Sequence, residues 1–352
     1  MLKQVVRFLG YFMSELGKKP SVAIVGFGLV GRIVALELIE RYDITVFEKD
    51  RQDGQTGAGT LAAAMLAPLA ESVICSQALA QQGLDAIEMW PTLLAKLDQE
   101  VFFQQAGSLI VAHQQDRGDL QSFQQRLKPL DGHHPYSADQ RMIAELEPEL
   151  SGRFTHGLFL PCEGQLDNLG FFKASYETLK RRGVQFNYGH EAVVAKGCVN
   201  NQAYDWIIDC RGIGAKVDNP LLRGVRGEVA RIYAPEVSLQ RPVRLMHPRY
   251  PIYIAPKPNH QFVIGATEVE SQDDAEITVR STLELLSAAY TVHSGFAEGR
   301  VLSLSAGLRP AFVDNHPRIE KKDNVIAING LYRHGYLLAP VVVQQALCEG
   351  LL

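Results

Sequence analysis

The sequence is poor in cysteine, and its few cysteines are not placed for a covalent framework. Cys75, Cys162, Cys198, Cys210 and Cys348 are odd in number and widely scattered, and no two of them form a CxxC pair. This spacing argues against a disulfide scaffold and against a metal site. We therefore expect reduced thiols, no metal and a cytoplasmic location.

The chain also lacks an excess of positive charge. It carries 35 lysines and arginines against 39 aspartates and glutamates, which gives a formal net charge of −4. Binding to a nucleic-acid backbone depends on a basic surface, and no long run of like charge is present. Nucleic acid is therefore not expected as a partner.

Long hydrophobic runs are absent too, since no apolar stretch approaches the roughly 20 residues that cross a bilayer. Residues 1–16 do show helical spacing of apolar side chains, including Leu2, Val5, Leu9 and Phe12. An amphipathic helix there could dock on a membrane or a partner. The favoured interpretation is a plain N-terminal extension over residues 1–20.

What the sequence does have is apolar content for a substantial core and one informative glycine pattern. At 352 residues and 46% hydrophobic content, the chain can form two domains of ordinary size.

An apolar strand runs into Gly26, Gly28 and Gly31, where glycine allows a tight turn, close approach to a pyrophosphate and close helix packing. A second strand, over residues 44–48, ends on Glu48, whose carboxylate can accept hydrogen bonds from ribose hydroxyls and repels a 2′-phosphate. The pattern predicts a site for FAD or NAD rather than NADP, with an ordinary glycine turn as the alternative.

The remaining periodicity predicts helices and strands that alternate between two interleaved domains. A helix is expected over residues 77–97, and paired strands are expected over residues 101–113. Residues 227–267 are strand-rich and indicate an antiparallel sheet that covers a site. A C-terminal helix is expected to follow Pro340.

Residues 22–48, 57–68, 207–214 and 330–340 carry motifs whose order resembles that of the D-amino acid oxidase superfamily of flavoproteins. Within it the chain is most similar to the glycine oxidases. This closer resemblance rests on the runs YIAPK at 253–257, VIGATE at 263–268, AGLRP at 306–310 and GLYRHGYLLAP at 330–340. Together the motifs cover residues 20–350 in outline.

The element pattern and the resemblance together indicate an α/β fold. A Rossmann-like FAD-binding domain is expected over residues 21–98, 160–225 and 300–352. A strand-rich α+β substrate domain, interleaved with it, is expected over residues 99–159 and 226–299.

The resemblance also implies that FAD lies extended from the first glycine turn to a point beneath the strand-rich domain. Val193 would meet the adenine through its backbone. The residues expected to contact FAD are Gly26, Phe27, Gly28, Leu29, Val30, Gly31, Glu48, Lys49, Gly59, Thr60, Ala64, Met65, Leu66, Val193, Gly212, Gly330, Arg333, His334, Gly335, Tyr336 and Leu337.

By the same resemblance, Arg309 and Tyr253 would hold the carboxylate of a small amino acid or amine, with Arg333 as a second cation. Glycine, sarcosine or a D-amino acid would lose a hydride to flavin N5, and the imine would then hydrolyse. Dioxygen is the expected acceptor and hydrogen peroxide its product, and a homo-oligomer is compatible with the sequence. Without the resemblance, Arg309 could equally be an ion-pair arginine and Tyr253 a packing residue.

Three alternatives stay open on the sequence alone. The first is a dehydrogenase of the same superfamily that passes electrons to a quinone or a carrier. The second is a nucleotide-binding partner protein in which flavin is structural or absent. The third is oxidation of a secondary amine on a larger molecule such as a modified nucleoside, against which the acidic charge balance counts.

Overall fold

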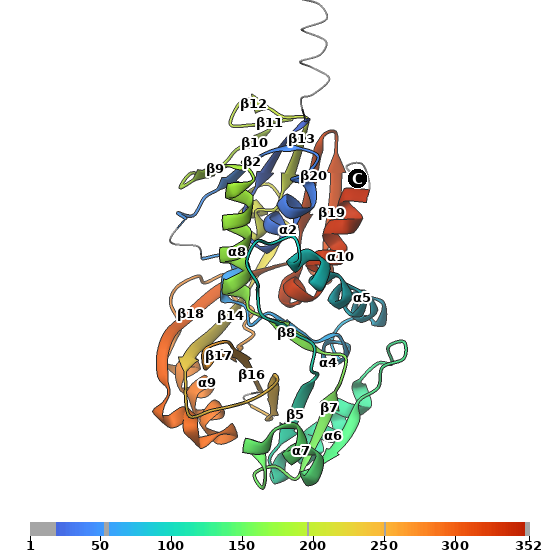
Figure 1. The fold of residues 1–352 in the computed structure, drawn as a ribbon, viewed down its shortest axis with the longest axis vertical. Coiled ribbons are helices and arrows are strands. Elements are labelled where there is room, and N and C mark those ends of the chain that lie inside the picture. The colour runs from blue at the N-terminus through green and yellow to red at the C-terminus, as the bar shows by residue number, and fades with distance from the viewer. Residues whose placement is uncertain (1–18, 53–55, 196, 250, 349–352) are drawn as a thin grey trace, which may run out of the picture.

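The computed structural model of this chain describes residues 19–52, 56–195, 197–249 and 251–348 (Figure 1). The predicted amphipathic helix over residues 1–16 lies outside these ranges. Within them, no helix combines the length and the apolar character needed to cross a membrane.

A six-stranded sheet at one end of the molecule carries the glycine pattern (Figure 1). Its neighbouring strands are parallel except for the β19–β20 pair, and β1 lies in the interior of the sheet between β13 and β2. In order across the sheet, the strands are β19 (Arg318–Lys322), β20 (Val325–Asn329), β13 (Trp206–Asp209), β1 (Ser21–Val25), β2 (Asp43–Glu48) and β9 (Gln185–Tyr188). This arrangement confirms the predicted α/β class.

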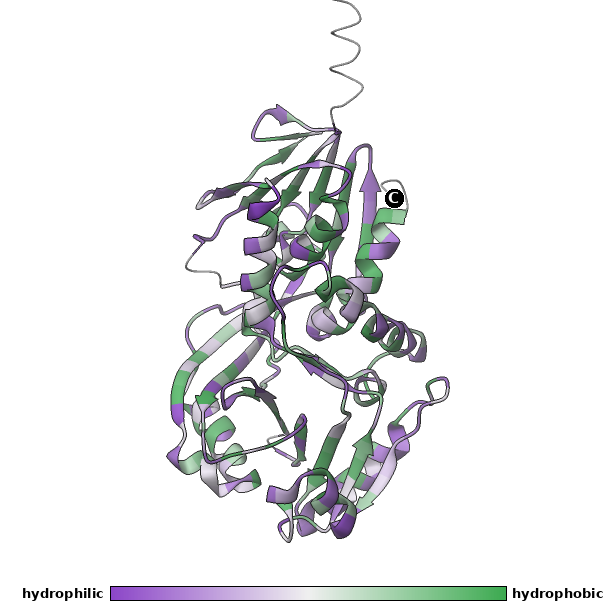
Figure 2. Cartoon of the chain, viewed as in Figure 1, coloured by the Kyte–Doolittle hydropathy of each residue, from purple (hydrophilic) through white to green (hydrophobic). Residues whose placement is uncertain are grey.

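Both faces of this sheet are covered, which explains why its interior strands are mostly apolar, with their polar residues chiefly at the strand ends (Figure 2). Helices cover one face, and their bounds are α2 (Leu29–Leu38), α5 (Gln77–Leu94), α8 (Asn168–Arg181) and α10 (Gly335–Cys348). A small antiparallel sheet covers the other face, formed by β10 (Val194–Ala195), β11 (Cys198–Val199) and β12 (Gln202–Ala203).

The expected start of the last helix was wrong, because α10 begins at Gly335 and contains Pro340. A proline within a helix leaves the carbonyl four residues earlier without its usual donor. In this chain the carbonyl oxygen of Tyr336 instead accepts a hydrogen bond of 3.0 Å from Nε1 of the buried Trp90. A tertiary contact from α5 thus satisfies the group that the proline leaves free.

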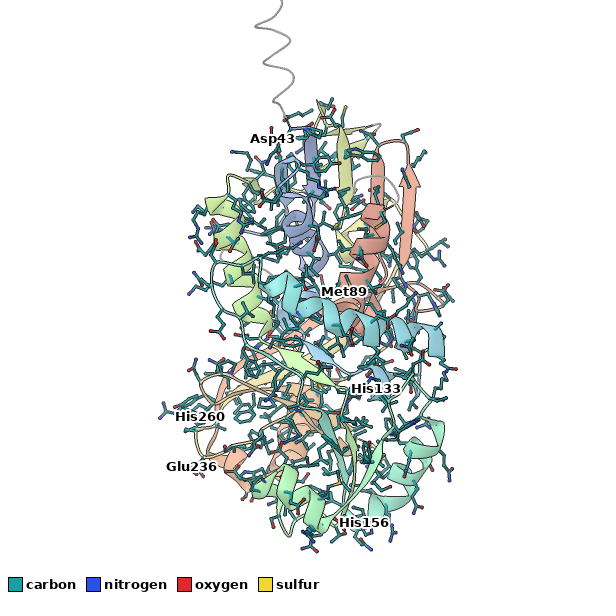
Figure 3. All side chains as sticks on the ribbon, turned by 45° about the vertical axis from the view of Figure 1, so that its right-hand side comes forward. Asp43, Met89, His133, His156, Glu236 and His260 are labelled. Carbon is teal, nitrogen blue, oxygen red and sulfur yellow. The ribbon has the colours of Figure 1, made fainter. Side chains whose placement is uncertain are left out.

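An eight-stranded sheet forms the second half of the molecule, with α9 (Val279–Val292) packed on it around a second apolar core. In order across the sheet, its strands are β18 (Arg300–Ala311), β14 (Arg223–Tyr233), β17 (Gln261–Gly265), β16 (Ile252–Lys257), β15 (Val243–Met246), β5 (Ser108–Ala112), β7 (His156–Leu160) and β6 (Tyr136–Asp139). Two helices on the same half are α6 (Arg117–Arg126) and α7 (Gln140–Leu146). Figure 3 shows His156 and Glu236 at this end and Asp43 at the other.

A three-stranded sheet, β3 (Met65–Leu66), β8 (Gly164–Leu166) and β4 (Phe103–Gln104), accompanies the two large ones. The strands expected over residues 101–113 do form, but they do not pair with each other. Instead β4 pairs with β8, whereas β5 pairs with β7 and β15. The predicted domain limits stay a prediction, although β18 belongs by pairing to the larger sheet.

Candidate active site

A cavity of about 950 Å³ opens between the two large sheets, at the carboxyl ends of β1 and β2. In open parallel sheets, ligands bind outside the carboxyl ends of the strands. The cavity wall includes the glycine turn after β1 and residues of the larger sheet such as Tyr253 and Arg309. One cavity therefore brings together the predicted dinucleotide site and the predicted substrate residues.

The three glycines of the turn fall into two roles. Gly26 has a φ of +93°, and a Cβ there would lie 2.5 Å from the carbonyl oxygen of Cys210. A Cβ on Gly31 would lie 2.1 Å from the carbonyl oxygen of Gly26. A Cβ on Gly28 would meet no described atom within 4 Å, so this position faces open space. Gly26 and Gly31 hold the turn together, while Gly28 leaves room for a ligand to approach the backbone.

The ends of α2 and β2 complete a cradle for a nucleotide diphosphate. Gly28 caps α2 without a side-chain hydrogen bond, and the first turn of the helix contains no acidic residue. Its amide groups are therefore available to an anion. The Glu48 carboxylate accepts hydrogen bonds from the amides of Phe27 (2.6 Å) and Asp50 (3.0 Å), which fix it beside the turn. These residues fit the diphosphate and the adenosine ribose of FAD.

Most of the residues predicted to contact FAD do line this cavity. They are Gly26, Phe27, Gly28, Leu29, Val30, Glu48, Lys49, Gly59, Ala64, Met65, Gly212, Arg333, His334, Gly335, Tyr336 and Leu337.

Five predicted residues do not line it, for local reasons. Gly31 packs against the turn, and Leu66 is fully buried in the core. The Thr60 hydroxyl donates to the carbonyl of Gly57, and Gly330, with a φ of +78°, packs against the Phe312 ring. The fifth residue, Val193, is exposed, and Asn200 hydrogen-bonds with both its amide and its carbonyl.

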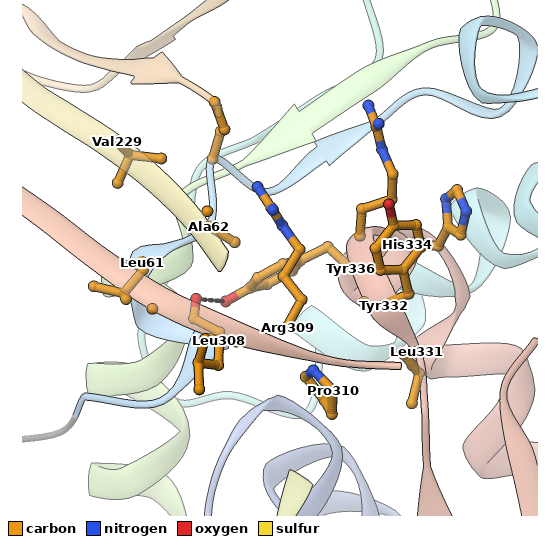
Figure 4. Close-up of a pocket in the computed structure, with 18 of the residues that line it drawn as sticks. Leu61, Ala62, Val229, Leu308, Arg309, Pro310, Leu331, Tyr332, His334 and Tyr336 are labelled. Carbon is orange, nitrogen blue, oxygen red and sulfur yellow. Dashed lines mark hydrogen bonds between the residues drawn. The ribbon is translucent and has the colours of Figure 1, made fainter. Parts of the chain in front are cut away.

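Arg309, labelled in Figure 4, and Tyr253 both line the cavity, and each side chain crosses a neighbouring strand at a glycine. The Arg309 guanidinium lies against Gly227, where a Cβ would come within 2.3 Å of it. The Tyr253 hydroxyl lies in the same way over Gly265, at 2.6 Å from the position of a Cβ. Burial raises the pKa of Tyr253, so its hydroxyl stays protonated and can donate.

Arg309 is oriented but not neutralised. Its two terminal nitrogens donate to the carbonyls of Arg226 and Thr267, each at 3.2 Å. Among the described residues, no carboxylate lies within ion-pair distance of it. A guanidinium has five N–H donors, so Arg309 keeps both its charge and donors for a ligand.

Arg333 is paired on both sides, unlike Arg309. Its Nε lies 2.9 Å from a Glu71 oxygen, and its Nη1 lies 2.5 Å from a Glu268 oxygen. Burial would lower the pKa of Arg333, but these two carboxylates outweigh it and raise that pKa. Arg333 lines the cavity as predicted, but its charge is already offset, so it is a weaker candidate for a substrate carboxylate than Arg309.

Glu71 and Arg244 are two cavity residues that the sequence did not reveal. Glu71 ends the short helix α4 (Pro68–Glu71), and one of its oxygens lies 3.2 Å from Nη2 of Arg244. Burial alone would raise the pKa of the Glu71 carboxyl, but Arg333 and Arg244 lower it to about 2. The one available signal was a single arginine in the apolar strand β15, which the register places opposite Tyr253.

Glu163 is buried behind this cluster, where it accepts hydrogen bonds from the Ala70 amide and the Ser108 hydroxyl. Burial raises the pKa of its carboxyl from 4.5 to about 7. The proton therefore stabilises the native state fully below pH 4.5, and this stabilisation is lost as the pH rises through 7.

Glu163→Gln has no proton to lose at this position, so its stability should not carry this pH dependence. From pH 5 to pH 8, we expect the unfolding free energy of the natural protein to fall by up to about 3 kcal/mol relative to that of Glu163→Gln. Urea unfolding of the FAD-bound proteins at both pH values measures this, and a pH-independent difference would contradict it.

The glycine turn of the six-stranded sheet and the unpaired Arg309 of the eight-stranded sheet line the same cavity. This arrangement is typical of a dinucleotide-dependent enzyme. Residues 21–345 match the family described as FAD dependent oxidoreductase (DAO). The chain belongs to this family and is an FAD-dependent oxidoreductase. This membership counts against the alternative of a partner protein without catalytic activity.

Individual proteins resemble the chain over most of its length. The chain is 38% identical over 318 residues to a Rhizobium etli protein named a thiamine biosynthesis oxidoreductase, ThiO, covering 90% of this chain and 92% of the relative. It is 24% identical to the glycine oxidase of Geobacillus kaustophilus, covering 91% of this chain and 90% of the relative. The crystal structure of glycine oxidase from Geobacillus kaustophilus superimposes with a TM-score of 0.78 and 22% identity, covering 93% of each chain.

Proposed function

We propose that this chain oxidises the C–N bond of a small amino acid or secondary amine of the glycine, sarcosine or D-amino acid type. The observation that carries the proposal is the unpaired Arg309 guanidinium, which faces the same cavity as the Tyr253 hydroxyl. A carboxylate in two parallel hydrogen bonds matches the planar donor fork of an arginine. The names of the relatives in the glycine oxidase group support this substrate class.

In this proposal the chain mainly supplies position and charge. Arg309 binds the substrate carboxylate and Tyr253 donates a further hydrogen bond to it, which fixes the amine-bearing carbon in the cavity. FAD, held at the glycine turn and Glu48, supplies the two-electron acceptor when it is bound. Val229, Met65 and Ala266 form an apolar wall beside Tyr253 that limits access of water.

No step in this scheme needs Glu71 as a base. Its pKa of about 2 makes it a poor proton acceptor. The substrate amine loses its proton to solvent, and the imine that leaves the site hydrolyses to an oxo acid and ammonia or an amine. Dioxygen takes up the two electrons and two protons as hydrogen peroxide.

Anaerobic reduction of the bound flavin tests the proposal directly. We expect glycine, sarcosine or D-alanine to bleach the flavin absorbance in the absence of oxygen, and we expect stoichiometric peroxide once air is admitted. Bleaching without peroxide formation would favour a dehydrogenase that uses another acceptor. No bleaching by any small amino acid or N-alkyl glycine would contradict the proposed substrate class.

A further inference from the structure

This inference rests on the proposed function and concerns the charge of the substrate. Beside Tyr253 the cavity is lined by three guanidinium groups, those of Arg244, Arg309 and Arg333, by the buried carboxylate of Glu71 and by the exposed carboxylate of Glu268 (Figure 4 shows Arg309 and its surroundings). Arg126, Arg249 and Arg280 also line the cavity, but among the described residues none of them lies within ion-pair distance of Glu71, and Arg280 pairs with Glu284.

Glu71 is the centre of the buried cluster. Its carboxylate, 7% exposed, lies 2.9 Å from Nε of Arg333, 3.2 Å from Nη2 of Arg244 and 3.5 Å from Nδ1 of His334. Burial lowers the pKa of His334, so this histidine adds no charge near neutral pH. Glu268 lies on the opposite side of Arg333. Of the three guanidinium groups, Arg309 is therefore the one that has no carboxylate partner among the described residues.

Arg244 would change this balance if it were free. The pairing of β15 with β16 places Arg244 directly opposite Tyr253, so both side chains lie on the face of the sheet that lines the cavity. The Nε of Arg244 is buried and has no hydrogen-bond partner among the described residues. Its ion pair with Glu71 offsets its charge, and the buried Glu163, whose pKa burial raises to about 7, lies near both groups.

We propose that Glu71 is a specificity-determining residue that restricts the site to substrates with one carboxylate. It does so by offsetting Arg244 and by sharing Arg333 with Glu268. A substrate with a second carboxylate would place that group close to Glu71 without a free counter-charge, and burying an unpaired charge is costly. Removing the Glu71 charge would free Arg244 to receive it.

The test uses two unreactive acids, acetate and malonate, titrated into the FAD-bound protein and followed by the flavin absorption spectrum. We expect the natural protein to bind acetate in preference to malonate. In Glu71→Gln, malonate should gain at least about tenfold in affinity relative to acetate, because one unit of negative charge is removed from a weakly screened site. In Arg244→Met the ratio should move in the opposite direction. A merely structural disturbance would weaken both acids together.

Two controls isolate the charge. Glu71→Asp keeps the charge and should keep the natural ratio. Glu147→Gln removes another buried carboxylate, which pairs with Arg241 at 3.1 Å and does not line the cavity, and should also leave the ratio unchanged.

The inference is overturned if the malonate-to-acetate ratio of Glu71→Gln equals that of the natural protein. Where that variant does not retain FAD, an unchanged ratio in Arg244→Met overturns it equally. The titrations need no turnover, so shifted ratios with no bleaching by amino acids would reject the proposed reaction alone. No spectral response to either acid would reject both.

Discussion

Arg309→Met is expected to lower kcat/KM for the amino-acid substrate by about 30-fold to 5000-fold, the equivalent of about 2–5 kcal/mol. The reason is that, of the three arginines near Tyr253 in the described cavity, Arg309 is the one without a carboxylate partner. Without it, a substrate carboxylate would enter the cavity with no charge to offset its desolvation. Steady-state kinetics with peroxide detection, and anaerobic flavin reduction, measure the loss.

The controls separate loss of the charge from loss of the fold. Arg309→Lys keeps the charge but not the planar fork, so it should recover part of the activity. Arg318→Met removes an arginine that stacks on Phe312 at 4.2 Å outside the cavity, and it should leave kcat/KM unchanged. FAD content should be the same in all three variants. An unchanged kcat/KM in Arg309→Met would remove this residue from the substrate site.

The nucleotide end of the cavity could be predicted from the sequence because its determinants are local. An apolar strand, three glycines at fixed spacing and an acidic residue at the next strand end lie within residues 22–48. The structure brings them together through one parallel strand pair, β1 with β2. The predicted contact of Val193 with adenine stays a prediction, and its amide and carbonyl both hydrogen-bond with Asn200.

The substrate end could be predicted only in part, since its charges come from segments far apart in the chain. Arg309 and Tyr253 were found through family motifs, but their orientation depends on Gly227 and Gly265 on neighbouring strands. That Arg333 is neutralised could not be anticipated, because Glu71 is 262 residues away in sequence. Long-range ion pairs leave no periodic signal in a single sequence.

The start of α10 could not be predicted for a similar reason. A proline normally marks the first turn of a helix or its end, and Pro340 was interpreted in that way. The helix continues through it because Trp90 satisfies the carbonyl of Tyr336. The same helix start places Gly335, Tyr336 and Leu337 along the cavity.

Gly28→Ala is expected to raise the Kd for FAD by about a hundredfold or more while leaving the apoprotein stable. Gly28 has an extended backbone, with a φ of −71° that alanine adopts without strain, and its Cβ would meet no described atom within 4 Å. The same Cβ would occupy the space through which a diphosphate reaches the amides of α2. Fluorescence titration of the apoprotein with FAD measures the affinity, and urea unfolding of the apoprotein measures the stability.

Gly31→Ala is the matched comparison, because it adds the same methyl group one helical turn further along. Its Cβ would lie 2.1 Å from the carbonyl oxygen of Gly26, so the turn itself must move. We expect this variant to lose about 1–3 kcal/mol of unfolding free energy in the apoprotein as well as affinity for FAD. Gly28→Ala therefore tests the space that FAD needs, whereas Gly31→Ala tests the packing of the turn. If Gly28→Ala bound FAD as tightly as the natural protein, the diphosphate would have to lie elsewhere in the cavity.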